Sequence, residues 1–186
     1  ALHDLATHGE QPAGVVLSGA TGKVGMLLRL GQGLVQVELR RVGARARSKL
    51  LVATAFGTYN REFRPNRTEF DWLSRDEAEV DKYIADPKCG FIATASLWRD
   101  LLGAQAEVQS KRLLSRLPRV PYWVFGGDRD PVGGNGRQVS AMVQDMHTFG
   151  LQVDFQLWPS GRHEMLNETN RAEVLAAIVR WVSARL

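Results

Sequence analysis

The sequence predicts an α/β fold, the C-terminal part of a doubly wound and mainly parallel sheet that carries an inserted helical region. Residues 120–125 form an apolar run of strand length, and residues 151–157 alternate strictly between apolar and polar side chains. An amphipathic helix is expected between them over residues 138–149, and a final helix is expected to begin at Asn170 with a capping-box-like pattern. The order strand, helix, strand, helix implies right-handed crossovers and therefore a parallel sheet.

The first residues have the apolar pattern of a helix but no N-terminal capping residue. Leu2, Leu5 and Ala6 share one face of a helical turn, and Gly9 is expected to end it. No capping residue precedes Ala1, so we expect the chain to start inside a helix.

The region from residue 21 to residue 117 has short apolar helical stretches and no convincing strand alternation. Asp76 or Ser74 is expected to cap a helix that Pro87 ends. We therefore predict a mainly helical insertion between two strands of the sheet. Its arginine-rich segment is interpreted as a solvated surface in preference to a membrane-facing one.

Composition restricts the class of protein. A hydrophobic content of 44% in 186 residues is enough for a sizeable core, and a net charge of +4 is a weak indication of nucleic-acid binding, which we do not expect. The single cysteine, Cys89, excludes an internal disulfide and favours a reducing compartment, so a cytoplasmic location is expected. No apolar run reaches membrane-spanning length.

A glycine-rich turn offers a rival hypothesis. In GVVLSGATGKVG a short apolar strand leads into Gly19, Gly22 and Gly25, a spacing that lets the backbone approach a pyrophosphate. This turn resembles the GATGxxG turn of atypical short-chain dehydrogenases, which would imply NAD(P) binding.

Three observations argue against nucleotide binding. Gly31 and Gly33 are expected to break the following helix after about two turns, where a longer crossover helix is needed. Arg40 and Arg41 stand where an acidic residue would bind the ribose. The chain also has no Tyr-x-x-x-Lys pair. We therefore expect no cofactor. We expect no metal either, because the segment HEMLN has Asn167 where a zinc-binding helix needs a second histidine.

An acid and a histidine follow the two C-terminal strands. Asp128 and Asp130 come after the first strand, and His163 follows the second. Since parallel strands end at one edge of the sheet, these loops are expected to meet there. A carboxylate that binds one imidazole nitrogen leaves the other free to act as a base. The aspartates are alternatively interpreted as turn caps, and the histidine as an ordinary surface residue.

The segments GGDRDPV and PSGRHEMLNE resemble the acid and histidine segments of the α/β-hydrolase superfamily, particularly cap-bearing serine hydrolases of the monoacylglycerol lipase and lysophospholipase type. VVLSGATGK is similar to the strand that leads into the cap, and FDWLSRDEAEVDKYIADPKCGF to a cap segment of bacterial members. The resemblance implies a core over residues 1–20 and 118–186 and a cap over residues 21–117. It also implies His163 as the base and Asp130, in preference to Asp128, as the acid.

The nucleophile of that family is missing from the sequence. No serine stands in Gly-x-Ser-x-Gly: Ser18, Ser96 and Ser160 all lack the flanking glycines. The resemblance therefore implies that the nucleophile elbow and the first strands precede Ala1, that the N-terminal portion of the fold is a partner of this segment, and that the segment alone is inactive. It implies an acyl ester or lipid substrate with transient membrane-surface contact. A non-catalytic binding module remains an alternative.

Overall fold

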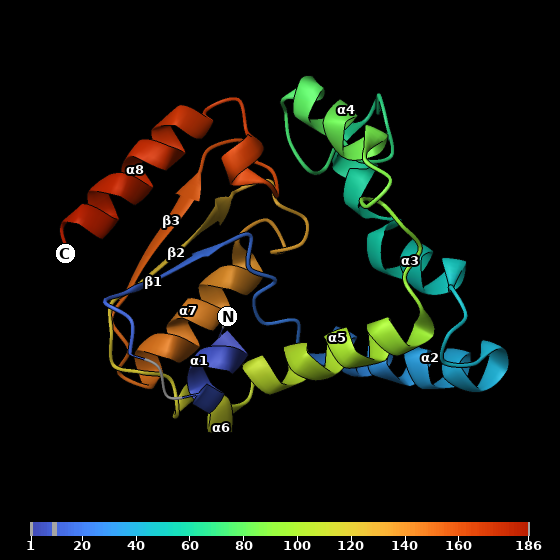
Figure 1. Ribbon diagram of the computed structural model, residues 1–186, viewed down its shortest axis with the longest axis horizontal. Coiled ribbons are helices and arrows are strands. Elements are labelled where there is room, and N and C mark those ends of the chain that lie inside the picture. Colours follow the sequence, from blue (N-terminus) through green and yellow to red (C-terminus); the bar gives the residue numbers. More distant parts are fainter. Residues whose placement is uncertain (1, 9–10, 186) are drawn as a thin grey trace.

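The computed structural model describes residues 2–8 and 11–185. Among them, three strands form one parallel sheet in the order β1 (Val15–Ser18), β2 (Tyr122–Gly127), β3 (Val153–Trp158). The strands are parallel and β2 lies between its neighbours, which confirms the predicted α/β class (Figure 1). All three strands therefore end at the same edge of the sheet.

Helices cover both faces of the sheet. Helix α7 (Arg137–Thr148) lies on one face together with α1 (Leu2–His8) and α6 (Lys111–Leu114), and α8 (Arg171–Ser183) covers the other (Figure 1). Side chains of β2 alternate between these faces because successive residues of a strand point to opposite sides. Tyr122 and Val124 pack in the α7 cluster, whereas Trp123 and Phe125 pack in the α8 cluster.

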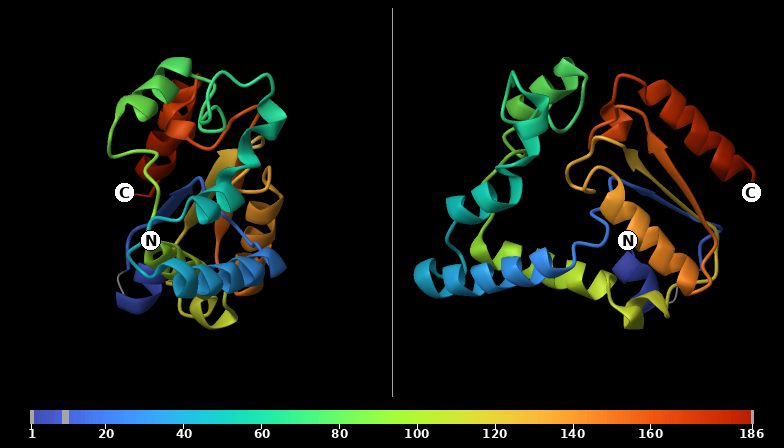
Figure 2. Two further views of the ribbon diagram at one scale, coloured as in Figure 1. Left: turned by 90° about the vertical axis from the view of Figure 1, so that its right-hand side faces the viewer. Right: turned by 180° about the vertical axis from the view of Figure 1, so that it is seen from behind.

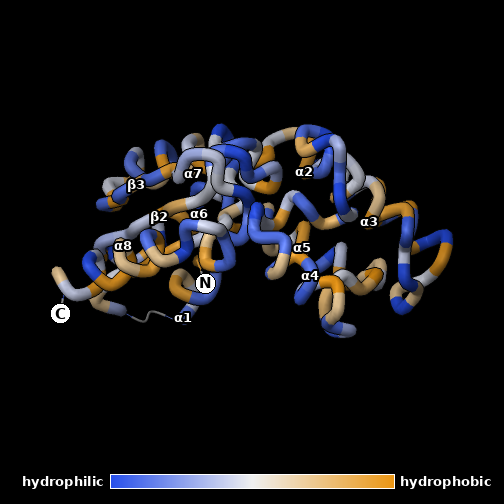
Figure 3. The backbone as a smooth tube through the Cα atoms, turned by 90° about the horizontal axis from the view of Figure 1, so that it is seen from above, coloured by the Kyte–Doolittle hydropathy of each residue, from blue (hydrophilic) through white to orange (hydrophobic). Residues whose placement is uncertain are grey.

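The residues between β1 and β2 form a helical arm, defined here as residues 26–108. It comprises α2 (Met26–Val42), α3 (Lys49–Phe56), the 3-10 turn η1 (Tyr59–Phe63), α4 (Glu77–Ala85) and α5 (Ala95–Val108). Helices α2 and α5 lie side by side, and the arm then curves back toward the C-terminal ends of the strands (Figure 2). A separate apolar cluster around Val35, Leu51 and Trp98 holds the arm together. Figure 3 shows hydrophobic segments in both the arm and the sheet region.

The expected break at Gly31 and Gly33 is wrong, because α2 continues through both glycines to Val42. A Cβ at Gly31 would lie 3.2 Å from Leu102 Cδ1 of α5. The glycine therefore allows close packing of α2 on α5, and that tertiary contact outweighs its low helix propensity. The length of this helix no longer argues against nucleotide binding.

The other expected elements are present, with shifts at their ends. Asp76 caps α4, since its Oδ1 accepts hydrogen bonds from the amides of Ala78 and Glu79 at 3.1 and 3.4 Å. Strand β2 begins two residues later than expected, at Tyr122. Asn170 precedes α8 as expected, but its side chain makes no capping bond; its Oδ1 accepts a hydrogen bond from Arg75.

The N-terminal helix has the predicted face. Leu2 and Ala6 of α1 are buried against Leu113 and Leu114 of the α7-side cluster, while Gly9, expected to end the helix, lies outside the described residues. The division into a core at residues 1–20 and 118–186 and a cap at residues 21–117 stays a prediction. Within the described ranges, none of the helices is long and apolar enough to cross a membrane.

Candidate active site

Asp130 lies in the loop that follows β2 and is held by its own turn. Its side chain is buried, with 2% of the residue exposed, and its Oδ1 accepts a hydrogen bond from the Val132 amide at 2.8 Å. The carbonyl of Asp130 accepts a further bond from the Asn135 amide at 2.8 Å. One carboxylate oxygen is therefore fixed by the turn, and the other points toward the next loop.

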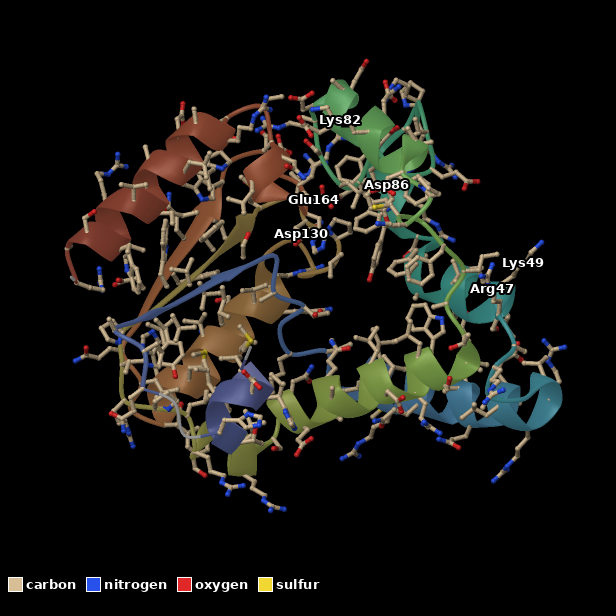
Figure 4. All side chains as sticks on the ribbon, in the orientation of Figure 1. Arg47, Lys49, Lys82, Asp86, Asp130 and Glu164 are labelled. Atoms are coloured by element: carbon tan, nitrogen blue, oxygen red, sulfur yellow. The ribbon has the colours of Figure 1, made fainter. Side chains whose placement is uncertain are left out.

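His163 provides the partner of that second oxygen. The imidazole Nδ1 lies 3.0 Å from Asp130 Oδ2, and the histidine side chain is 24% exposed. Figure 4 labels Asp130 at the end of the sheet nearest the helical arm. The carboxylate favours the tautomer with a proton on Nδ1, so Nε2 is left to exchange a proton with another group.

The loops after β2 and β3 are hydrogen-bonded to each other before they reach these side chains. The Asp128 amide donates to the Trp158 carbonyl at 3.1 Å, and the Arg129 amide donates to the Gly161 carbonyl at 3.0 Å. These bonds continue the β2–β3 ladder past the strand ends. The sheet register thus brings the acid and the histidine, 33 residues apart in sequence, within hydrogen-bonding distance.

Gly19, at the end of β1, lies against the histidine. Its φ is +60°, and a Cβ there would lie 3.2 Å from His163 Cε1 and 3.3 Å from the His163 carbonyl oxygen. Gly22 also has a positive φ, and a Cβ on it would collide with the backbone of Gln138. These glycines thus permit close packing of the chain on itself, which accounts for two of the three glycines of the rival hypothesis.

An aromatic wall in the helical arm faces the imidazole. The Trp72 ring centroid is 5.5 Å from that of His163, and Trp72 packs against Phe56 and Tyr59 at 5.9 and 5.2 Å. Phe56 in turn contacts Trp98 at 5.6 Å. Burial raises the pKa of Tyr59, and the negative charge of Asp130 raises it further, so the phenol remains neutral at physiological pH.

Asp128 occupies a different position from Asp130. It is half-buried, its Oδ1 has no hydrogen-bond partner among the described residues, and within the same part of the chain it makes no hydrogen bond to His163. The third glycine, Gly25, precedes α2 with a φ of +65° and open space around it. Neither residue contacts the Asp130–His163 pair in the hydrogen-bond pattern described above.

Sequence reasoning overlooked several residues of this site. Trp72 and Tyr59 belong to the arm and are separated from His163 by about half of the chain, so no local pattern connects them to it. Sequence patterns also gave no role to Arg162 and Glu168 of the histidine loop, or to Arg75 of the arm, which bonds to Glu168. The available signal was a glutamate five residues after the histidine, within the quoted segment PSGRHEMLNE.

The chain combines a parallel α/β sheet with a buried carboxylate, Asp130, that is hydrogen-bonded to His163 at the C-terminal edge of the sheet. This combination is typical of α/β hydrolases. Residues 1–170 match the family described as serine aminopeptidase, S33. The chain belongs to this family and so to the α/β-hydrolase superfamily, as the resemblance implied. A comparison with curated protein sequences found no match.

Solved structures share the fold. The chain is similar to a highly thermostable carboxyl esterase from Bacillus coagulans in complex with glycerol, with 22% identity and a TM-score of 0.89 over 99% of this chain and 60% of that one. It is also similar to a structure described as a lipase in an open form, with 22% identity and a TM-score of 0.88 over 100% of this chain and 61% of the other. The chain thus spans about three fifths of the length of these structures.

Proposed function

We propose that this chain contributes the acid and the base of a serine-type carboxylic ester hydrolase. The observation that carries the proposal is the 3.0 Å hydrogen bond between Asp130 and His163 at the C-terminal edge of a parallel sheet. That edge is where α/β folds bind ligands. Membership of the serine aminopeptidase, S33 family supports a hydrolase with a serine nucleophile. Because no Gly-x-Ser-x-Gly occurs in the sequence, we propose that residues outside it supply the serine.

In the proposed reaction, the serine hydroxyl attacks the ester carbonyl while His163 Nε2 accepts its proton. The imidazolium then gives that proton to the leaving alcohol, and an acyl-enzyme remains. Water attacks the acyl-enzyme with His163 again as base, which releases the carboxylic acid and restores the serine. Asp130 keeps Nδ1 protonated and stabilises the imidazolium in both steps.

The substrate class proposed is an acyl ester of the monoacylglycerol or lysophospholipid type. The support is the aromatic wall of the arm, in which Trp72 packs beside the imidazole and is continued by Phe56 and Trp98. Such a wall favours an apolar acyl chain near the reacting carbonyl. A panel of esters differing only in acyl length tests this: Trp72→Ala should reduce turnover of long-chain esters more than that of acetyl esters.

Contact with a lipid surface is proposed as a transient step of substrate capture. The first turn of α2 exposes Met26, Leu27 and Leu30 to solvent. Co-sedimentation with phosphatidylcholine vesicles, with and without phosphatidylglycerol, should show binding that the triple substitution of these residues by serine abolishes. A cytoplasmic location stays a prediction.

The decisive experiment compares a complete polypeptide, its His163→Ala variant and the 186-residue chain alone. A polypeptide that contains this chain together with an upstream Gly-x-Ser-x-Gly segment should hydrolyse p-nitrophenyl esters and react with a fluorophosphonate probe. Its His163→Ala variant should lose both. The 186-residue chain alone should show no burst of acyl-enzyme, and a clean burst would refute the assignment of the nucleophile. Saturable NAD(P) binding by the chain would instead support the dehydrogenase alternative.

A further inference from the structure

The loop that carries His163 also contains Glu168, whose carboxylate is fully buried. None of the residue is exposed, although it lies only five positions after the histidine. A buried carboxylate is costly to desolvate unless several donors surround it. Glu168 must therefore be held by specific partners, and those partners indicate what it does.

Its donors come from both sides of a junction between the histidine loop and the helical arm. Oε1 accepts hydrogen bonds from the Arg162 amide at 3.0 Å and the Arg75 amide at 3.2 Å. Oε2 accepts from Arg75 Nε at 2.8 Å and from the Thr169 amide at 2.9 Å. One of these donors, the Arg162 amide, immediately precedes the histidine. Arg75 belongs to the arm, 93 residues away in sequence.

The same two segments meet again at the backbone of the histidine. The His163 amide donates to the Trp72 carbonyl at 3.4 Å, and the Glu164 amide donates to the Leu73 carbonyl at 2.8 Å. The Arg162 guanidinium donates to the carbonyls of Asp71 and Ser74. Three successive residues of the loop, 162–164, are thus hydrogen-bonded to residues 71–74 of the arm.

This arrangement joins the imidazole and the aromatic wall into one unit. Trp72, whose carbonyl binds the histidine amide, also packs its ring at 5.5 Å from the imidazole. Figure 4 labels Glu164, the residue that follows His163, at the end of the sheet that the arm approaches. A displacement of residues 71–75 would therefore move the backbone of His163 relative to Asp130, whose carboxylate is fixed by its own turn.

We propose that Glu168 is a positioning residue that, through Arg75, fixes the histidine loop to residues 71–75 of the helical arm, so that His163 reaches its productive orientation only when the arm is seated. This inference rests on the proposed function, because His163 must act as the base for its position to matter. A glutamine keeps one oxygen that can accept from the Arg162 and Arg75 amides, but its NH₂ group would face the donors Arg75 Nε and the Thr169 amide. The substitution therefore breaks the link to the Arg75 guanidinium and loosens the histidine loop from the arm. The imidazole then loses its fixed distance to Asp130 and to the nucleophile.

The test is Glu168→Gln in the complete, nucleophile-containing protein. We expect kcat to fall about 100-fold, the loss typical of a displacement of about 1 Å, while KM changes less than about threefold. Arg75→Gln should reproduce this split from the arm side, and the double variant should lose little more than either single one, since both act on one contact. A kcat within about threefold of the wild type in both single variants would overturn the proposal, as would fully additive losses.

Arg171→Gln is the matched control. It removes an ion pair at the same junction, Arg171 Nη1 to Asp76 Oδ2 at 2.7 Å, and a 3.4 Å hydrogen bond from the same Nη1 to the Glu168 carbonyl. The Glu168 carboxylate and residues 162–164 keep all of their own hydrogen bonds. We expect it to lower the melting temperature with little effect on kcat. If it lowers kcat as much as Glu168→Gln does, the effect is general weakening of the junction and the proposal is wrong.

A second readout separates this inference from the proposed function. In the 186-residue chain, the Nδ1 proton of His163, which faces Asp130 Oδ2 at 3.0 Å, should give a proton NMR signal that can be followed without any catalysis. Glu168→Gln, or Arg75→Gln if the former does not fold, should shift or broaden that signal, and Arg171→Gln should not. If the complete protein has no esterase activity but the NMR signal shifts as expected, the proposed function is refuted and the positioning role of Glu168 and Arg75 is retained. Unchanged signals in the glutamine variants would refute the link alone.

Discussion

Replacing Asp130 by asparagine tests how the carboxylate acts on the histidine. Asp130 Oδ1 accepts from the Val132 amide at 2.8 Å, and Oδ2 lies 3.0 Å from His163 Nδ1. An asparagine must keep its oxygen toward the Val132 amide, because two N–H donors cannot face each other. Its NH₂ group therefore faces Nδ1, which has to become the acceptor, and the histidine proton moves to Nε2.

The consequence for the proposed reaction is large although the atoms barely move. With Nε2 protonated, the imidazole cannot accept the proton of the nucleophile. The loss expected for this wrong tautomer is about 10⁴-fold in kcat, or about 5 kcal/mol of activation free energy. Stability should change little, because the hydrogen-bond count at the pair is preserved.

Ester hydrolysis by the complete protein measures the loss, and nitrogen NMR shifts of His163 in the 186-residue chain report the tautomer directly. Asp128→Asn is the matched control, because it removes a carboxylate charge only two residues from Asp130. Asp128 Oδ1 has no hydrogen-bond partner among the described residues, so this variant should keep its activity within about threefold of the wild type. The reasoning is refuted if Asp130→Asn keeps more than about a tenth of the activity, or if the tautomer does not change.

Two further predictions concern stability. Gly19→Ala should lower the free energy of unfolding by about 1–2 kcal/mol because its φ of +60° disfavours a Cβ, and it should also lower activity by pressing on His163. Gly33 lies inside α2, where a Cβ would meet no described atom within 4 Å, so Gly33→Ala should raise the free energy of unfolding by about 0.5–1 kcal/mol. Equal melting temperatures for Gly19→Ala and Gly33→Ala would contradict this expectation. Hydrogen bonds lower the pKa of Glu38 from 4.5 to about 2; the bond from Arg41 has the largest effect and that from Ser48 the next. The ionised Glu38 therefore stabilises the folded state above pH 4.5, and this stabilisation is lost as the pH falls toward 2. Chemical unfolding across this range should show that Glu38→Gln removes part of the pH dependence, and an unchanged profile would contradict the assignment.

Local sequence patterns were sufficient to predict strands and helix caps, because these depend on residues that are close together in the chain. The alternation at residues 151–157 identified β3 because one face of an outer strand is covered, and the apolar run at 120–125 identified β2 because both faces are buried. The sequence narrows the cap of α4 to Asp76 or Ser74 because capping involves residues only two or three positions away, and the structure shows that Asp76 is the cap. The helix break predicted at Gly31 was wrong, because the packing of this glycine against Leu102 of another helix cannot be recognised from neighbouring residues.

The same division applies to the candidate site. Asp130 and His163 were both singled out because each follows a strand, and parallel strands end at one edge. The family resemblance favours Asp130 over Asp128 as the acid, whereas strand order alone leaves both aspartates open. Neither shows that Asp130 Oδ2 is the atom that bonds to the imidazole. That choice depends on the turn at Val132 and on the bonds that continue the β2–β3 ladder.

Periodicity and chain order, which are local properties, are enough to predict the α/β class, the order of strands and helices, and the two loops that carry an acid and a histidine. The packing of Trp72 against the imidazole, and the hydrogen bonds from Arg75 of the helical arm to Glu168 of the histidine loop, appear only in the folded chain. Contacts between residues about 90 positions apart depend on how the helical arm returns to the sheet edge, and no local pattern records that path.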